Sequence, residues 1–157
     1  MDQKEFYATL PRKRMGAGVL FFNEQGELLI VNPVYKDHWS IPGGVVDQDE
    51  SPLTAVLREV REELGLKIQT ASFVLIDYYA ATDEKDENLQ FIFYGGVLTA
   101  EQISQIKLAK DELSEYRFVD LVQELPLLSK KLSLRIPAAL EAIEGKTAFY
   151  LENGIKK

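Results

Sequence analysis

The stretch GVVDQDESPLTAVLREVREELGL, residues 44–66, carries the clearest structural signal in this chain. Ser51 is a residue type that caps helix N-termini, and Pro52 suits the first helical position, where its missing N–H costs nothing. Gly65 suits the left-handed backbone conformation that ends many helices. Together these three residues predict a helix over residues 52–64.

Acidic and apolar side chains separate onto two arcs of this helix. At about 100° per residue, Glu59, Glu62 and Glu63 converge beside the apolar face that would pack on a sheet. Like charges at this spacing repel each other, and a hard divalent cation, which prefers oxygen ligands, would relieve that repulsion. Arg58 and Arg61 keep open the alternative of a solvated surface with mixed charges. The apolar face consists of Leu53, Val56, Leu57, Val60 and Leu64.

The residues around the helix extend this pattern. Upstream, IPGGVV at residues 41–46 predicts a sharp turn whose two glycines let the backbone approach a ligand closely. As a unit, the stretch is similar to Gly-x5-Glu-x7-Arg-Glu-U-x-Glu-Glu-x-Gly-U, with U apolar, the signature of the Nudix (MutT-like) hydrolase superfamily. Every specified position is filled, by Gly44, Glu50, Arg58, Glu59, Val60, Glu62, Glu63, Gly65 and Leu66.

The resemblance implies a metal site. In that family the counterparts of Glu59, Glu62 and Glu63 bind a divalent metal, and the carbonyl of the residue that matches Gly43 often adds a ligand. The expected cofactor is Mg2+, with Mn2+ as a substitute. We expect Glu62 and Glu63 to be the main ligands and Glu59 to be a third or a water-mediated one.

Supporting positions follow from the same resemblance. Arg58 would orient a ligating carboxylate. Arg58 and Glu50 would together brace the loop and the helix. Family members often add a carboxylate from a loop before a late strand. In the segment KDELSEYRF, residues 110–118, Glu112 is the better match and Glu115 the second, with an acidic surface loop as the alternative. The remaining supporting positions are Gly44 and Gly65.

These residues imply the hydrolysis of a diphosphate linkage. A metal ion would neutralise the charged phosphate oxygens, lower the pKa of a bound water and orient it, and a carboxylate would take the proton as general base. The base is Glu62, Glu59 or Glu112, and these three residues with Arg58 form the expected catalytic group. The number of metal ions stays open.

The substrate class is reached mainly by elimination. The chain lacks the marks of several family subclasses, and without cysteine it lacks the catalytic thiol of the isopentenyl-diphosphate isomerases. We expect a nucleoside triphosphate or its deoxy analogue, giving the monophosphate and pyrophosphate. The alternatives are a nucleotide sugar, ADP-ribose or a dinucleotide. A further alternative, from a different functional class, is a regulatory module that binds a nucleotide without cutting it.

Several side chains outside the helix are candidates for substrate contact, although ordinary packing is the alternative for each. The basic run at residues 12–14 is interpreted as a solvated tail rather than a phosphate contact. His38, the single histidine, is interpreted as a surface residue. The candidate platforms for a base are Trp39, Tyr79 and Phe93, with Phe22 and Tyr35.

Composition limits the partners. The chain has 157 residues and a formal net charge of −7, which disfavours nonspecific binding to a nucleic acid polymer. No apolar stretch is long enough to cross a bilayer, and the beginning of the chain does not resemble a signal peptide. We therefore expect no membrane partner and a cytoplasmic location. One domain over residues 1–157 is expected, and the apolar segment at residues 6–10 is a candidate contact in a homodimer.

The rest of the chain favours strands, because it is rich in β-branched and aromatic residues. A turn at residues 24–26 predicts one hairpin, and the acidic run at residues 83–87 predicts another. We expect an α/β fold with a mixed β-sheet between helices, the α/β/α sandwich that the resemblance also implies. The predicted strands cover residues 15–23, 27–32, 67–81, 88–99, 116–120 and 147–151, and a second helix covers residues 129–144.

Overall fold

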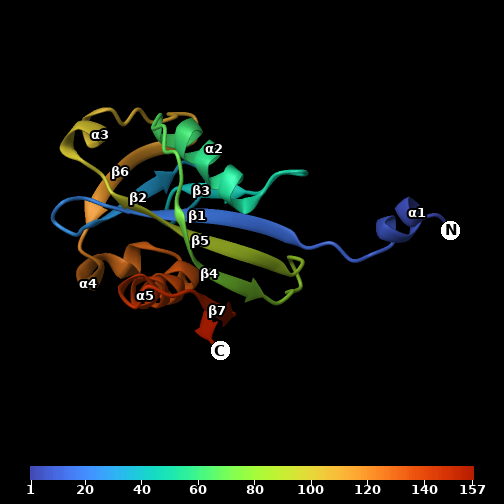
Figure 1. Cartoon of the computed structure of the whole chain (residues 1–157). Coiled ribbons are helices and arrows are strands. Elements are labelled where there is room, and N and C mark those ends of the chain that lie inside the picture. The colour runs from blue at the N-terminus through green and yellow to red at the C-terminus, as the bar shows by residue number, and fades with distance from the viewer.

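The computed structural model describes residues 1–157, apart from the side chain of Val122 (Figure 1). In the described part of the chain, no helix is both long and apolar enough to span a membrane. The helices are α1 (Gln3–Ala8), α2 (Pro52–Leu64), α3 (Ala100–Ser104), α4 (Leu121–Glu124), the 3-10 turn η1 (Leu125–Leu127) and α5 (Lys130–Glu144). The strands are β1 (Arg14–Phe22), β2 (Leu28–Pro33), β3 (Gly43–Val45), β4 (Ser72–Tyr79), β5 (Asn88–Val97), β6 (Leu113–Val119), β7 (Phe149–Glu152) and β8 (Ile155–Lys156).

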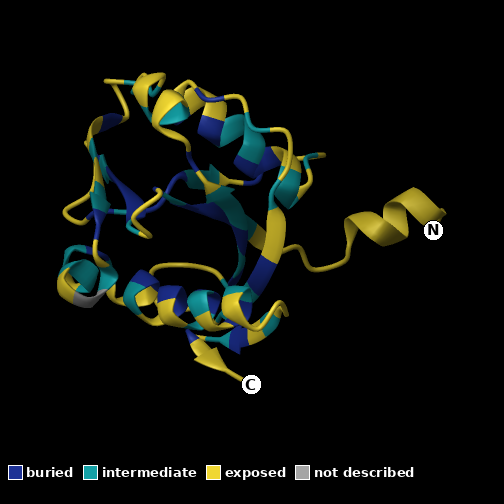
Figure 2. Ribbon diagram, turned by 60° about the vertical axis from the view of Figure 1, so that its left-hand side comes forward, coloured by how far each residue is buried: buried dark blue, intermediate teal, exposed yellow. Residues whose placement is uncertain are grey.

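A single sheet runs through the molecule in the order β6-β2-β1-β5-β4-β7-β8, and β3 pairs with β1. The pairs β1·β5 and β4·β7 are parallel, whereas the other pairs are antiparallel. Helices α2 and α5 cover opposite faces of this sheet (Figures 1 and 2). The predicted mixed sheet between helices is therefore confirmed.

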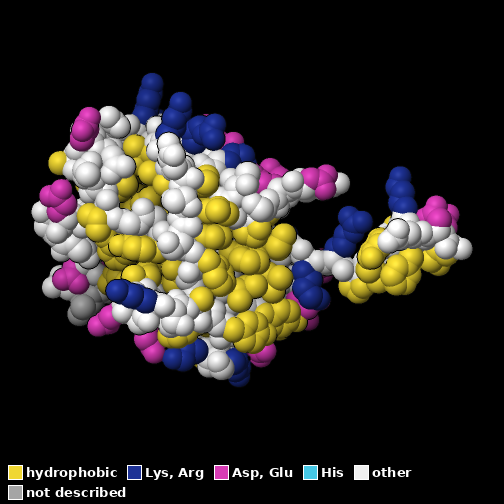
Figure 3. Space-filling model, viewed as in Figure 1, with side chains coloured by type: hydrophobic (Ala, Val, Ile, Leu, Met, Phe, Trp, Pro, Cys, Tyr) yellow, Lys and Arg dark blue, Asp and Glu magenta, His cyan; other side chains and the backbone are white. Residues whose placement is uncertain are grey.

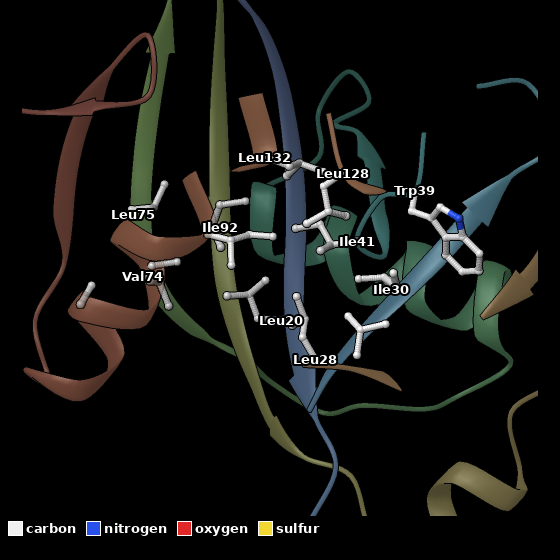
Figure 4. Close-up of a cluster of buried hydrophobic side chains, with 14 of the residues drawn as sticks. Leu20, Leu28, Ile30, Trp39, Ile41, Val74, Leu75, Ile92, Leu128 and Leu132 are labelled. Carbon is white, nitrogen blue, oxygen red and sulfur yellow. The ribbon is translucent and has the colours of Figure 1, made fainter. Parts of the chain in front are cut away.

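Two hydrophobic cores separate the sheet from these helices, because successive side chains of a strand point to opposite faces. In β1, Leu20 and Phe21 are both fully buried. Leu20 belongs to the core beneath α5, with Ile92 (Figure 4). Phe21 belongs to the core beneath α2, with Val56. The apolar face of α2 is thus held on the sheet, and its acidic residues are carried on a fixed element.

The two predicted helices and both hairpins are confirmed. The Ser51 hydroxyl accepts the Thr54 N–H at 3.1 Å at the start of α2. Gly65 ends α2 with φ 68°, in the left-handed conformation. Strands β1 and β2 form one antiparallel hairpin, and β4 and β5 form the other. Local capping chemistry was therefore enough to predict where α2 begins and ends.

Two strands begin three or more residues from the predicted position. The strand predicted over residues 67–81 begins only at Ser72. The chain before it packs Leu66 and Ile68 against the core beneath α2, so their apolar alternation reflects burial rather than pairing in the sheet. Strand β6 begins earlier than predicted, at Leu113, because its first residues extend the ladder with β2.

A short strand, β3, stands where a glycine turn was predicted. Gly18 of β1 pairs with Gly43 of β3. Gly43 has φ 148°, and a Cβ there would lie 2.1 Å from the Ala17 carbonyl oxygen. Only glycine lets the two backbones approach this closely. Strand β3 fastens the loop before α2 to the centre of the sheet, next to the acidic residues of the helix.

Candidate active site

Three carboxylates, called here the carboxylate cluster, meet beside the end of α2. Glu59 and Glu63 come from α2 and Glu112 from the loop before β6, and one oxygen of each lies within 4.8 Å of the others. The loop is tied to the helix because the Ala109 N–H donates to the Glu63 carbonyl at 3.1 Å. The Val34 N–H donates to the Glu112 carbonyl at 2.9 Å. Backbone hydrogen bonds thus bring Glu112 to a helix that is distant in sequence.

Glu63 is the most enclosed member, with 5% of its surface exposed. Its carboxylate accepts the Gly43 N–H at 3.2 Å. Burial raises the pKa of Glu63 to about 8; the Gly43 N–H opposes this shift, and the charges of Glu59 and Glu112 add to it. Burial is also the main cause of the raised pKa of Glu59. The cluster therefore resists carrying three negative charges by itself.

The donor set fits a hard divalent cation. Carboxylate oxygens are preferred protein ligands of Mg2+, which usually takes only a few of them and completes its shell with phosphate and water. A cation in the cluster would also offset the burial and repulsion that raise the pKa of Glu63. Glu59, Glu63 and Glu112 are therefore the residues able to hold such an ion.

Arg58 organises the surroundings of the cluster. Its guanidinium donates to both carboxylate oxygens of Glu50, at 2.8 and 3.1 Å. It also donates to Glu59 at 3.0 Å, to Glu62 at 3.1 Å and to the Val45 carbonyl at 3.2 Å. The hydrogen bond with Glu50 is the main cause of the raised pKa of Arg58 and of the lowered pKa of Glu50. One side chain thus ties the loop after β3 to α2 and orients Glu59.

Gly44 leaves room for a cluster carboxylate. A Cβ on Gly44 would lie 2.4 Å from Oε1 of Glu59 and 2.7 Å from its Cδ. The bare backbone of β3 therefore lets the Glu59 carboxylate sit directly against the strand, while the neighbouring Gly43 offers its N–H to Glu63. Both glycines of the pair are explained by contacts with α2 and β1.

Glu62 and Glu115 lie outside the cluster in this structure. The Glu62 side chain is 50% exposed, pairs with Arg58 at 3.1 Å and lines a surface hollow of about 400 Å³ with other residues of α2. The Glu115 side chain is 47% exposed and pairs with Arg117 at 2.8 Å. The third carboxylate of the cluster is therefore Glu112.

Two of the aromatic candidates are paired with cations. Trp39 is 9% exposed, and the Arg117 guanidinium lies 4.6 Å from the centre of its ring. The Tyr79 ring lies 4.1 Å from the Lys131 ammonium and 5.4 Å from the Arg135 guanidinium. Trp39 packs in the core beneath α5, and both cations beside Tyr79 come from α5.

The other aromatic candidates and the histidine differ in exposure. Phe93 is 6% exposed in the core beneath α2. Phe22 is partly buried, with its ring centre 6.1 Å from that of Tyr94. His38 is exposed, as expected of a surface residue. Phe93 and Phe22 thus contribute mainly to the packing of the two cores.

Tyr35 and Lys36 lie beside the carboxylate cluster, in the loop after β2. Tyr35 is 68% exposed. Partial burial is the main cause of its raised pKa, and the charges of Glu63, Glu112 and Glu59 add to it. Lys36 opposes the raised pKa of Glu63, and its ammonium lies 5.5 Å from the Tyr35 ring centre. Lys36 was missed in the sequence because no motif marks this loop.

Comparison with known proteins gives a consistent assignment. The family model described as the NUDIX domain matches residues 12–138. An RNA pyrophosphohydrolase from Hahella chejuensis is 36% identical over 61 residues, which are 39% of this chain and 38% of that protein. The matches with the first curated relatives each cover less than half of the relative's length.

Solved structures share the fold. The MutT protein from Methanosarcina mazei superposes with a TM-score of 0.67 at 24% identity, covering 88% of this chain and 99% of that one. A UDP-X diphosphatase gives a TM-score of 0.73 at 20% identity, covering 96% and 75%. At this level of identity the likeness establishes the architecture alone.

Proposed function

Because this chain belongs to the NUDIX domain family, we propose that it is a hydrolase that uses a divalent cation to cleave a diphosphate linkage in a nucleotide derivative. The carboxylate cluster carries this proposal. In it, Glu63 is buried and one of its oxygens lies within 4.8 Å of oxygens of Glu59 and Glu112. Buried like charges are costly unless a cation accompanies them, and a diphosphate is a substrate that such a cation would serve.

Each member of the cluster has a role in this proposal. Glu59, Glu63 and Glu112 would hold Mg2+, or Mn2+ in its place. When bound, the ion supplies neutralisation of the phosphate charge and a lowered pKa for the attacking water. Arg58 keeps the Glu59 carboxylate in place, and the Gly43 N–H does the same for Glu63. Two of the three carboxylates are therefore held in a fixed orientation before substrate arrives.

Glu112 is the favoured general base. Glu59 and Glu62 both accept hydrogen bonds from Arg58, so their carboxylates are already engaged. Among the described residues, no donor binds the Glu112 carboxylate. Glu112 also lies in the loop before β6 and faces α2 across the cluster. Glu112 would hold the ion through one carboxylate oxygen, which leaves the other oxygen able to accept a proton from water. Glu62 and Glu59 are the other candidates.

We favour a nucleoside triphosphate, or its deoxy analogue, as substrate, with the monophosphate and pyrophosphate as products. Lys36 supports this choice, because it places a positive charge at the edge of the cluster, where it would contact a phosphate beyond the cleaved linkage. Trp39 and Tyr79 remain the proposed aromatic contacts for the base. The negative net charge of the chain agrees with a small substrate rather than a nucleic acid polymer.

A substrate panel tests this proposal. The protein is incubated with Mg2+ and each of the common nucleoside triphosphates, a UDP-sugar, ADP-ribose, a dinucleoside polyphosphate and a 5′-triphosphorylated oligoribonucleotide, and the products are separated by chromatography. We expect a nucleoside triphosphate to give monophosphate and pyrophosphate fastest. Turnover confined to another member of the panel would replace the substrate but keep the hydrolase.

The contrasting class is a module that binds nucleotides without cutting them. The retention of all three cluster carboxylates, with the supporting Arg58, argues against it. Binding of a nucleotide, measured by calorimetry, with no turnover of any panel member in Mg2+ or Mn2+ would favour the module and overturn the hydrolase.

We also propose that residues 1–157 form one domain. Both hydrophobic cores are built on the same sheet, and β1 and β5 contribute side chains to each of them. The two helical layers therefore share their central strands, and neither layer has a sheet of its own.

A further inference from the structure

The first residues of the chain form an arm that leaves the body of the molecule. Every residue from Met1 to Arg14 is exposed, and α1 has no buried residue. Figure 1 shows α1 lying well beyond the end of β1. The arm nevertheless carries apolar side chains: Phe6 is 51% exposed, Tyr7 57% and Leu10 41%. Figure 3 shows hydrophobic side chains gathered on one side of the arm.

A six-residue helix of this kind needs a partner. Isolated helices shorter than about 12 residues are marginal in water. Asp2 and Glu5 form a capping box, with hydrogen bonds of 2.7 and 2.9 Å, but a cap adds only about 1 kcal/mol. The Phe6 and Tyr7 rings touch edge to face, 5.6 Å apart. The short helix α1 and its exposed aromatic rings together indicate a segment that is stabilised by docking on another surface.

The arm is directed away from its own body. Pro11 disfavours a helical backbone at the residue before it, and α1 ends at Ala8. Lys13 forms an ion pair with Glu87, and Arg14 donates to the Asp86 carbonyl at 3.5 Å. The root of the arm is thus fastened to the loop between β4 and β5. These contacts set the direction in which the arm leaves the end of β1.

The body carries an uncovered apolar surface. Helix α2 packs mainly on β1 and β3, and Phe93 of β5 also lies in the core beneath it. Farther from α2, the same face of β5, β4 and β7 carries apolar side chains that stay partly exposed in the described structure. We call the apolar surface of these strands the open face. Figure 3 shows it as a continuous hydrophobic area to one side of α2. Phe73 is 45% and Tyr150 47% exposed there. Its members are Met15, Phe73, Ile76, Leu89, Phe91 and Tyr150.

We propose that the arm of one copy of this chain docks on the open face of a second copy, and that the exchange is reciprocal in a two-fold symmetric dimer. Each chain carries one arm and one open face, so a dimer has one open face for each arm. A two-fold axis uses each of them twice. The fastened root and Pro11 favour docking on a partner over folding back. This proposal is independent of the proposed hydrolase activity.

Disulfide trapping tests it, because the natural chain has no cysteine. Phe6→Cys and Phe73→Cys are made separately, mixed and oxidised, and we expect a covalent dimer on a non-reducing gel. The matched control pairs Phe6→Cys with Leu134→Cys, an exposed position on α5, and should stay uncoupled. In the double variant Phe6→Cys/Phe73→Cys, a monomer with both thiols consumed would show docking within one chain and overturn the proposal.

The mass in solution gives the second readout. Light scattering should find a dimer of the 17.8 kDa chain. Deletion of residues 1–10 should weaken dimerisation by more than about a thousandfold, because the dimer loses three apolar side chains from each of its two arms. Phe73→Asp should act alike, and circular dichroism checks that the variant stays folded, because the Phe73 ring also packs against Phe91 and Phe93. A protein that stays monomeric, or a dimer that the deletion leaves intact, contradicts the exchange.

Discussion

At the scale of single residues, Glu63 is an acid in an unfavourable place. It is buried, faces two other carboxylates and has one backbone N–H as its hydrogen-bond donor. Such a group is retained where a bound cation uses its charge.

The stability of the metal-free protein should depend on Glu63. Its pKa is raised from 4.5 to about 8, so between these values the folded chain holds a proton that the unfolded chain has lost. Stability then falls as pH rises. In EDTA we predict that the free energy of unfolding, from urea titrations, drops by up to about 4 kcal/mol between pH 4.5 and pH 8. Glu63→Gln should remove most of this decline, with the raised pKa of Glu59 accounting for the rest, and an equal decline in that variant would refute the assignment.

Arg58 should matter through geometry rather than charge. Arg58→Lys keeps the charge but cannot bind both oxygens of Glu50 and reach Glu59. We predict a fall in kcat of about 10- to 100-fold, typical of losing a group that orients a ligand. The matched control is Arg61→Lys on the same helix, which should leave kcat within about twofold. Steady-state kinetics of both variants at saturating Mg2+ decide this, and equal effects would count against a special role for Arg58.

At the scale of elements, the packing of β3 against α2 sets the position of the Glu59 carboxylate. A Cβ on Gly44 would lie 2.4 Å from Oε1 of Glu59. The obstructed atom is at the far end of a side chain, which can move at little cost to the fold. We predict that Gly44→Ala changes the melting temperature little but weakens Mg2+ binding about tenfold, as measured by calorimetry. Unchanged affinity would show that the contact between β3 and Glu59 is dispensable.

A buried ion pair joins the elements on the other side of the sheet. Asp77 of β4 accepts from Arg135 of α5 at 2.7 Å and from the Gly154 N–H at 3.0 Å. Asp77→Ala leaves a buried guanidinium unpaired and should cost about 3 kcal/mol in urea unfolding. Glu115→Ala, which breaks an exposed pair, should cost less than about 1 kcal/mol. Similar losses in the two variants would mean that burial does not set the cost.

Elements differed in how far sequence could predict them. The ends of α2 follow from Ser51 and Gly65, whose capping preferences are local. Strand β3 was missed because a paired glycine strand has the same residues as a glycine turn, and only the position of β1 distinguishes them. The short helices α1, α3 and α4 are below the length at which periodicity is informative.

The site shows the same limit. Spacing along α2 put Glu59, Glu62 and Glu63 on one arc, but it did not show that Glu62 would stay half exposed while the other two meet in the cluster. Glu112 was predicted by resemblance alone, because the hydrogen bonds that bring its loop to α2 are long-range. Lys36 lies in a loop without a motif. Chemistry that depends on one helix was therefore predictable, and chemistry that depends on the meeting of three segments was not.

At the scale of the whole molecule, a net charge of −7 opposes the approach of a polyphosphate. The substrate must therefore be neutralised locally, and the carboxylate cluster with a bound cation is where this would occur. The same acidic surface disfavours long nucleic acids. The proposed selectivity for a small nucleotide thus combines a local attraction with a general repulsion.

The most direct test of the central claim is the rate of nucleotide hydrolysis as a function of Mg2+ concentration in the wild-type chain and in Glu63→Gln, with circular dichroism confirming that both are folded. We predict saturable dependence on Mg2+ in the wild type and a loss of about a thousandfold or more in the variant. Hydrolysis that persists in EDTA, or a folded Glu63→Gln variant with a near-normal rate, would contradict a cation held by the carboxylate cluster.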